Sequence, residues 1–355
     1  MYARRSTARP GASAERELVA ARLTAQLLSG PAARDPVGVA ERLLAVQAQE
    51  LRGARLTVRA RTEGLSVADL DRALAARELV VSWLNRGTLH LVRREDYPWL
   101  HALTTPQLAT GCARRLAQEG VTPDAAERGV AAVERALAGE GPLTRAQLRE
   151  RVAAAGVRTE GQALVHLLFA ASLRGICVRG PMAGREQAFV LRRDWLGEPP
   201  RVDRDTALAE LARRYLAGHG PAGAPDLARW AGLPLRDARA GLARIAAELT
   251  ERPDGLVDLA GRPPAEPVPP PRLLGPYEPL LLGWVSRAPL VGGGGQGLVT
   301  SNGIVRPFAL VDGRAVAIWR LADGGGLELE PFERVRAADV RALEREARDV
   351  RRFLG

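Results

Sequence analysis

Apolar residues spaced three and four positions apart predict two helices at the start of the chain. The first is expected from Glu15 to near Gly30. The second opens at Asp35 and Pro36, which fit an N-cap residue and the first helical position, and is expected to continue through Val46. The chain therefore begins with two short helices joined by a tight connection.

The next pattern changes from helical to alternating. A third helix is expected after Ser66, because Asp69 three residues later completes a capping box. Two short β-rich runs, 80–84 and 88–92, then flank the glycine-containing turn 85–87 and predict a hairpin. Helices followed by a hairpin form the outline of a winged helix.

The same outline recurs twice. In the second copy, helices are expected over 127–137, 144–155 and 161–173, followed by hairpin strands over 176–179 and 188–191. In the third copy, helices are expected over 205–218, 225–230 and 235–249. The last two are joined by the short turn 232–234, which is a helix-turn-helix signal.

A proline-rich connector over 262–271 separates these copies from a different pattern. Strands are expected over 280–282, 298–299, 308–311, 315–319 and 327–330. Asp312–Gly313 is a strong hairpin turn, and 292–297 is expected to be a flexible glycine-rich loop. A charged helix over 337–354 closes the chain.

These patterns predict an α+β fold with three tandem winged-helix (helix-turn-helix) modules and a small C-terminal antiparallel β domain. The expected divisions are a disordered lead-in over 1–13, modules over 14–125, 126–200 and 201–262, and the β domain with its closing helix over 263–355.

Composition restricts the function classes. The 355 residues are 46% hydrophobic and 26% charged, which is typical of globular proteins. No apolar run reaches the roughly 18 residues of a membrane helix, and the N-terminus has no signal-peptide pattern, so we expect a cytoplasmic, nucleoid-associated protein without membrane contact. The net charge of +10 indicates a polyanionic partner.

The reactive side chains are few. The chain contains no lysine, all 51 basic residues being arginine, so no side-chain Schiff base can form. Cys112 and Cys177 are isolated, and the four histidines are scattered, so no metal site and no cofactor are expected.

Gln47 and Gln49 are a more specific feature. In a helix, side chains two positions apart point about 200° from each other, whereas in an extended segment they point the same way. If both amides meet in a pocket, the second helix must end or distort here. The alternative is a polar helix terminus facing water.

The order and spacing of several motifs resemble the AlkZ-like winged-helix DNA glycosylases. The resemblance covers roughly residues 15–354 and rests on Gln47-Ala48-Gln49, Trp83 to Val92, Gly161 to Leu164, Asp226 to Leu233 and Val311 to Arg314. The family's catalytic motif, a glutamine, an apolar residue and a second glutamine, maps onto Gln47 and Gln49. A sister branch has aspartate at the second position, and this chain departs from that branch.

The resemblance implies a function and a shape. The winged helices would line a concave basic surface, and a hairpin of the C-terminal domain, here the glycine-rich 290–304, would approach the minor groove. The chain would be a monomeric, monofunctional glycosylase acting on double-stranded DNA containing N7- or N3-alkylated purines. Bulky genotoxin adducts or interstrand crosslinks are the expected lesions, in repair or self-resistance, and Gln47 and Gln49 would hold the attacking water.

Five further residues are expected to contact DNA, namely Arg86, Thr88 and His90 on the first hairpin and Arg236 and Arg239 on the third copy's last helix. For the hairpin residues the alternative is purely structural: Thr88 and His90 as hydrogen-bonded strand residues, and Arg86 as a solvated turn.

Two other function classes make different demands on the sequence. A non-enzymatic transcriptional regulator built from winged helices would bind undamaged DNA sequence-specifically. A metal-dependent nuclease needs clustered carboxylates or histidines, and no such spacing is present.

Overall fold

Helices dominate the N-terminal part of the computed structural model, which describes residues 11–199, 202–292 and 295–355. The elements here are α1 (Ala12–Ala25), α2 (Pro36–Leu43), β1 (Val46–Gln47), α3 (Leu51–Arg59) and α4 (Val67–Ala75). The two capped helix starts are confirmed: the Gly38 amide donates to the Asp35 carboxylate at 2.7 Å, and Ser66 and Asp69 form the capping box.

The second helix is shorter than predicted. It ends at Leu43, because Leu44 adopts φ 64° and turns the chain out of the helix. Val46 and Gln47 then extend as a strand that pairs with Leu91 and His90. The expectation of a helix through Val46 is therefore wrong, since sheet pairing outweighs the helical spacing of the apolar residues.

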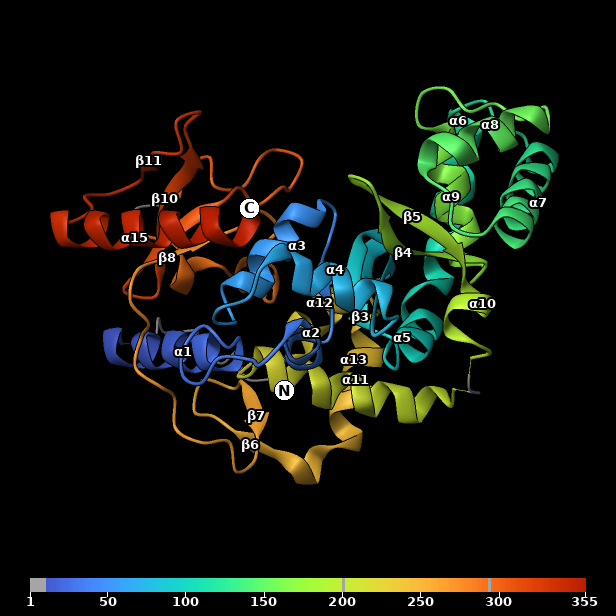
Figure 1. Ribbon diagram of the computed structural model, residues 1–355. Helices are drawn as coiled ribbons and strands as arrows, with labels where there is room; N and C mark the ends of the chain where they lie inside the picture. The colour runs from blue at the N-terminus through green and yellow to red at the C-terminus, as the bar shows by residue number, and fades with distance from the viewer. Residues whose placement is uncertain (1–10, 200–201, 293–294) are drawn as a thin grey trace.

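Both predicted hairpins form, and they belong to one antiparallel sheet of order β1-β3-β2-β4-β5 (Figure 1). Its strands after β1 are β2 (Leu79–Trp83), β3 (Leu89–Arg93), β4 (Cys177–Ala183) and β5 (Glu186–Leu191). The single turn η1 (Asn85–Gly87) connects β2 to β3, and Val81 of β2 pairs with Arg179 of β4. Residues 46–93 and 177–191, which the sequence assigned to separate modules, thus share a sheet.

Six helices lie between and after these hairpins, and three of them were not predicted. They are α5 (Tyr97–Thr104), α6 (Ala109–Gln118), α7 (Pro123–Glu140), α8 (Arg145–Ala154), α9 (Ala163–Leu173) and α10 (Arg192–Leu196), with the turn η2 (Pro106–Leu108) before α6. Helix α6 was missed because it buries only Cys112 and Leu116, so its apolar stripe is too narrow to show a helical period.

The third group of helices confirms the predicted order but not the last boundary. Its elements are α11 (Arg204–His219), α12 (Ala224–Ala231), α13 (Leu235–Arg244), η3 (Ala246–Glu248), β6 (Leu249–Glu251) and β7 (Val257–Leu259). The expected helix over 235–249 stops at Arg244, because Leu249 is already extended and pairs with Leu259.

The C-terminal part contains a four-stranded antiparallel sheet of order β11-β10-β9-β8. Its elements are β8 (Arg272–Leu274), α14 (Pro279–Leu282), η4 (Ala288–Leu290), β9 (Phe308–Val311), β10 (Arg314–Leu321), β11 (Leu327–Pro331) and α15 (Ala337–Leu354). The predicted strand over 280–282 is wrong: this apolar run is one helical turn, begun by Pro279 and capped by Glu278. The hairpin turn at Asp312–Gly313 is confirmed, with φ 49° and 78°.

Two predicted flexible segments lie partly outside the described residues. Of the lead-in over 1–13, residues 1–10 are outside, and Ala12 and Ser13 already belong to α1. Of the glycine-rich loop over 292–297, residues 293 and 294 are outside. Beyond it, Val299 and Val305 form an isolated antiparallel bridge.

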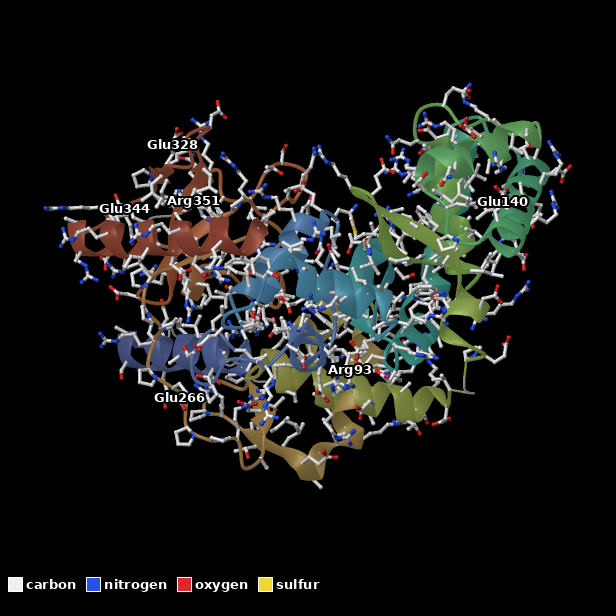
Figure 2. All side chains as sticks on the ribbon, in the orientation of Figure 1. Arg93, Glu140, Glu266, Glu328, Glu344 and Arg351 are labelled. Atoms are coloured by element: carbon white, nitrogen blue, oxygen red, sulfur yellow. The ribbon has the colours of Figure 1, made fainter. Side chains whose placement is uncertain are left out.

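The ribbon has a U-shaped outline, with α15 and β8–β11 forming one arm, α6–α9 the other, and α3, α4 and the hairpins between them (Figure 1). Both arms carry exposed carboxylates, such as Glu140 on α7 and Glu344 on α15 (Figure 2). None of the helices in the described ranges is both long enough and apolar enough to cross a membrane.

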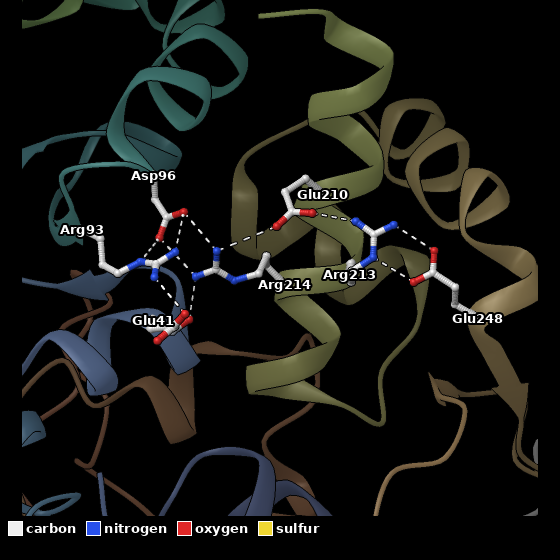
Figure 3. Close-up of polar contacts among 7 residues, drawn as sticks. All are labelled: Glu41, Arg93, Asp96, Glu210, Arg213, Arg214 and Glu248. Atoms are coloured by element: carbon white, nitrogen blue, oxygen red, sulfur yellow. Dashed lines mark hydrogen bonds and ion pairs between the residues drawn. The ribbon is translucent and has the colours of Figure 1, made fainter. Parts of the chain in front are cut away.

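An ion-pair network joins α11 to the first hairpin (Figure 3). Arg93 at the end of β3 and Arg214 of α11 both donate to Asp96, at 2.8 and 3.0 Å. The side chain of Asp96 is only 3% exposed, and its hydrogen bonds raise the pKa of Arg93. The contact fixes the third helix group against the strand that carries His90.

Candidate active site

Gln47 and Gln49 both turn their amides toward the η1 hairpin turn. The Gln47 Oε1 accepts from Arg86 Nη2 at 3.3 Å, and the Gln49 Oε1 accepts from the Leu89 backbone amide at 3.1 Å. Gln47 is half-buried and Gln49 is exposed. Because only an oxygen can accept these bonds, the orientation of each amide is fixed by its donor.

The local backbone explains why both glutamines reach the same turn. The Ala48 amide donates to the Leu89 carbonyl at 2.7 Å, so pairing with β3 continues one residue past β1. Val46 and Ala48 are buried, and in an extended segment the residues between and after them point to the opposite side. The question left open by the sequence is thus answered in favour of the extended segment.

Arg86 connects Gln47 to the end of α12. Its Nη1 donates to the Trp230 carbonyl and lies 3.5 Å from the Arg229 carbonyl, both in the last turn of that helix. A helix C-terminus carries partial negative charge, so this contact stabilises the guanidinium. Burial, with the nearby Arg229, lowers the pKa of Arg86 to about 10, which leaves it protonated at neutral pH. Arg86 is therefore not a solvated turn residue.

Gly232 allows Arg86 to approach the end of α12. It follows α12 in the left-handed conformation, with φ 71°, and a Cβ at this position would lie 2.8 Å from the Arg86 backbone nitrogen. Gln107 of η2 donates to the Gly232 carbonyl at 3.2 Å. The α12–α13 turn, η1 and η2 therefore meet beside the two glutamines.

His90 lies directly opposite Gln47 on the neighbouring strand and is 2% exposed. Its Nδ1 is 2.9 Å from the Thr88 carbonyl, which can only accept, so Nδ1 carries the proton and Nε2 has the lone pair. Burial, reinforced by Arg86, lowers the pKa of His90 to about 3, so the imidazole is neutral at pH 7. Thr88 donates to the Asn85 carbonyl at 3.2 Å.

Arg236 and Arg239 lie apart from the glutamines, on α13. The Arg236 side chain is 85% exposed, with Asp237 at 3.4 Å, and Arg239 is exposed as well. Both follow Gly232 within two helical turns. Their contact with DNA, like that of Arg86, Thr88 and His90, stays a prediction.

Sequence reasoning missed other residues near the site. The Asn85 amide is fully buried, and neither its nitrogen nor its oxygen has a hydrogen-bond partner among the described residues. Tyr277 adopts φ 56°, and burial, together with the Glu50 carboxylate, raises its pKa. Left-handed backbone is costly for such residues, yet Leu44, Arg86 and Tyr277 all adopt it around the glutamine motif. Asn85 belongs to the predicted turn 85–87, but nothing local marks it as buried, and no local signal marks Tyr277.

The two thiols and the apolar cavity do not contribute to this site. Burial raises the pKa of both Cys112 and Cys177 to about 11, so neither thiol is activated. Across 11–199, 202–292 and 295–355, no cluster of three His, Cys, Asp or Glu side chains has metal-binding geometry. An apolar cavity of about 260 Å³ lies between α6, α7 and α9, and neither glutamine lines it.

Comparison with known proteins gives a consistent result. A family model described as DNA glycosylase AlkZ-like matches residues 40–353. An interstrand DNA cross-link repair glycosylase of Streptomyces sahachiroi is 30% identical over 371 residues, covering 96% of each chain. The solved structure of Streptomyces sahachiroi DNA glycosylase AlkZ superposes with a TM-score of 0.76 at 26% identity, covering 95% of this chain and 96% of that one.

Proposed function

The chain belongs to the AlkZ-like DNA glycosylase family, and on that premise we propose that it hydrolyses the N-glycosidic bond of N7- or N3-alkylated purines in double-stranded DNA. In this proposal three winged helices form a concave basic surface that receives the duplex, and a monomer is sufficient. The net charge of +10 supports a DNA partner.

The observation that carries the proposed mechanism is the fixed orientation of two amides. Arg86 and the Leu89 amide each occupy one lone pair of a glutamine carbonyl, and each carbonyl keeps a second lone pair. Two such oxygens can accept the protons of one water and hold it below C1′ of the damaged nucleotide. Gln47 and Gln49 are therefore the proposed catalytic residues, with neither forming a covalent bond to DNA.

Amides are sufficient because the leaving group is already activated. A purine alkylated at N7 or N3 carries positive charge and departs with little help from an acid. The remaining tasks are to stabilise an oxocarbenium-like sugar by dipoles and to orient the water. The neutral His90 adds no positive charge beside this cation.

The proposed product is an abasic site with an intact strand. Strand cleavage by β-elimination through an enzyme imine requires an amine nucleophile, and no lysine side chain is present. We propose bulky adducts and interstrand crosslinks as the lesions, in repair or self-resistance, because the relative from Streptomyces sahachiroi is named for cross-link repair.

Base release from a duplex containing N7-alkylguanine tests the function. We expect wild type to leave abasic sites, and Gln47→Ala and Gln49→Ala each to lower the single-turnover rate by about 100-fold while still binding DNA. Gln118→Ala, at the end of α6, is the matched control and is expected to keep the wild-type rate.

The opposite result would point to the rival function. If base release never exceeds spontaneous depurination and the chain binds one undamaged sequence selectively, it acts as a transcriptional regulator. Comparing a methyl adduct with a bulky adduct tests the lesion class, since activity on methyl adducts alone contradicts the proposed substrate.

A further inference from the structure

Three arginines from separate parts of the chain lie near one another beside α12, with Arg229 close enough to lower the pKa of both Arg86 and Arg287. Arg86 comes from η1, Arg229 from α12 itself, and Arg287 from the loop before η4. The Arg86 Nη1 lies 3.5 Å from the Arg229 carbonyl.

The loop that carries Arg287 is fastened to the same helix. The Val285 amide donates to the Asp226 carboxylate at 2.8 Å. Asp226 and Arg229 are three residues apart on α12, so they lie on one helix face. This contact brings the loop, and with it Arg287, to the face that presents Arg229.

The positive charge of this cluster is not neutralised by any carboxylate in the described part of the chain. Among the described residues, no carboxylate lies within ion-pair distance of the three guanidinium groups. The two oxygens of Asp226 are occupied by the Val285 and Gly223 amides. The arginines of the network around α11 differ, because Arg93, Arg213 and Arg214 are each paired with carboxylates (Figure 3).

Electrostatics within the cluster are repulsive. Burial and then Arg229 lower the pKa of Arg287, just as they lower that of Arg86. Arg86 and Arg287 are half-buried, so water screens their charges less than it screens fully exposed arginines. An anion bound here would therefore be stabilised by charges that the folded protein leaves uncompensated.

The cluster also keeps hydrogen-bond donors free. A guanidinium has five N–H groups. Arg86 uses at most three, for the Trp230, Arg229 and Gln47 oxygens. Arg287 donates its Nε to the Leu281 carbonyl at 2.6 Å, and no protein acceptor among the described residues engages its two Nη groups.

We propose that Arg86, Arg229 and Arg287 bind one phosphate of the DNA backbone beside the damaged nucleotide. The site rests on the proposed glycosylase function, because Arg86 donates directly to Gln47. An unpaired guanidinium so close to Gln47 would oppose the cationic sugar that forms during base release. A bound phosphate neutralises that charge, so the positive charge beside Gln47 is balanced only when DNA is bound.

A scan with neutral methylphosphonates tests the site without requiring catalysis. The probe is a duplex containing a tetrahydrofuran abasic analogue, with each flanking phosphate replaced in turn by a methylphosphonate. We expect one position to weaken wild-type binding about tenfold. Arg229→Gln and Arg287→Gln should weaken binding of the unmodified duplex by a similar factor and reduce the slope of log K against log salt by about 0.9 each.

The decisive result is whether the arginine substitution and the methylphosphonate substitution weaken binding independently of each other. At the sensitive position, the methylphosphonate should cost the two variants little further affinity, because they have already lost the contact. Arg128→Gln, an exposed arginine on α7, is the matched control and should retain the full tenfold effect. Thermal melting verifies that each variant is folded.

Two outcomes overturn the proposal. Either the arginine variants bind the unmodified duplex like wild type, or the methylphosphonate effect adds fully to theirs. Both outcomes can be distinguished from failure of the proposed function. Coupling without base release would refute the glycosylase activity but support the phosphate site. Base release without coupling would refute only the phosphate site.

Discussion

The two glutamines are held by donors of different kinds. The Gln49 oxygen accepts from a backbone amide, which no side-chain substitution removes. The Gln47 oxygen accepts from the Arg86 side chain, which is itself held by the carbonyls at the end of α12. The orientation of Gln47 can therefore be altered without changing Gln47.

Arg86→Lys tests this dependence. Lysine keeps the positive charge but lacks the planar fork that reaches both Gln47 and the α12 carbonyls. We expect the single-turnover rate of base release to fall about tenfold while the salt dependence of DNA binding is unchanged. Equal losses in rate and affinity would show that Arg86 serves DNA binding alone.

Two buried histidines make stability sensitive to mild acid. Burial lowers the pKa of His90 and of His219 to about 3, whereas an unfolded histidine titrates near 6.5. Below pH 6.5 the unfolded chain binds protons that the folded chain does not, so stability is complete above this pH and is lost as pH falls toward 3. The expected loss is up to about 1.4 kcal/mol per histidine for each pH unit below 6.5.

Urea unfolding at pH 7 and at pH 5.5 measures this effect. His219→Gln should lose part of the pH dependence whatever its own stability. His166→Gln, whose imidazole is not fully buried, should keep most of it. A wild-type free energy of unfolding that is constant over this interval would contradict the prediction.

At the residue scale, the sequence predicts the candidate catalytic pair and the hairpin residues Arg86 and His90 beside it, but not the arginines that lie next to Arg86. Gln47 and Gln49 are recognisable because their spacing matches a family motif. Arg229 and Arg287 are not, because each becomes notable only through contact with Arg86 or α12. Arg229 even lies inside a motif used for the resemblance, where nothing local marks it as functional.

Secondary-structure elements were predicted well where the signal is local. The caps at Asp35 and Ser66 and the turn at Asp312–Gly313 depend on neighbouring residues, and all three are confirmed. Prediction failed where distant contacts decide, as in the strand Val46–Gln47, which needs β3 as its partner. The strand expected over 280–282 failed for a different reason: the run belongs to the four-residue helix Pro279–Leu282, and a short apolar run has no period of its own.

Gly232→Ala tests the contact between α12 and η1. The change introduces left-handed strain of about 1–2 kcal/mol and a Cβ that would lie 2.8 Å from the Arg86 nitrogen. We expect lower stability together with slower base release, because Arg86 must move away from Gln47.

Gly156→Ala is the matched control for strain. Gly156 follows α8 with φ 68°, but a Cβ there would meet nothing within 4 Å. It should lose comparable stability and keep the wild-type rate. If both variants release bases equally fast, the approach of α12 to η1 does not affect the site.

On the scale of the whole molecule, α3 links the glutamine segment to the C-terminal domain. Arg61, two residues after this helix, pairs with Glu278 at 2.5 Å, and both side chains are 0% exposed. Arg59 pairs with Glu346 and Asp349 of α15, both at 2.7 Å. Gly53 lets the helix approach the loop before α14, since a Cβ there would lie 2.7 Å from the Pro276 carbonyl.

Glu278→Gln should therefore be strongly destabilising. It leaves the Arg61 guanidinium buried without a carboxylate, at an expected cost of about 3 kcal/mol in the free energy of unfolding. Glu140→Gln breaks the exposed pair with Arg151, in which both side chains are 41% exposed, and should change stability by less than about 1 kcal/mol. Similar urea midpoints for the two variants would contradict the prediction.

The shared sheet limits how the molecule can be dissected. Because Val81 of β2 pairs with Arg179 of β4, a fragment ending at residue 125 would carry β2 as an unpaired edge. All five residues of β2 are buried in the intact chain, so that edge would be both apolar and unprotected. Such a fragment is expected to self-associate or aggregate, so the chain should not be divided between the first two predicted modules.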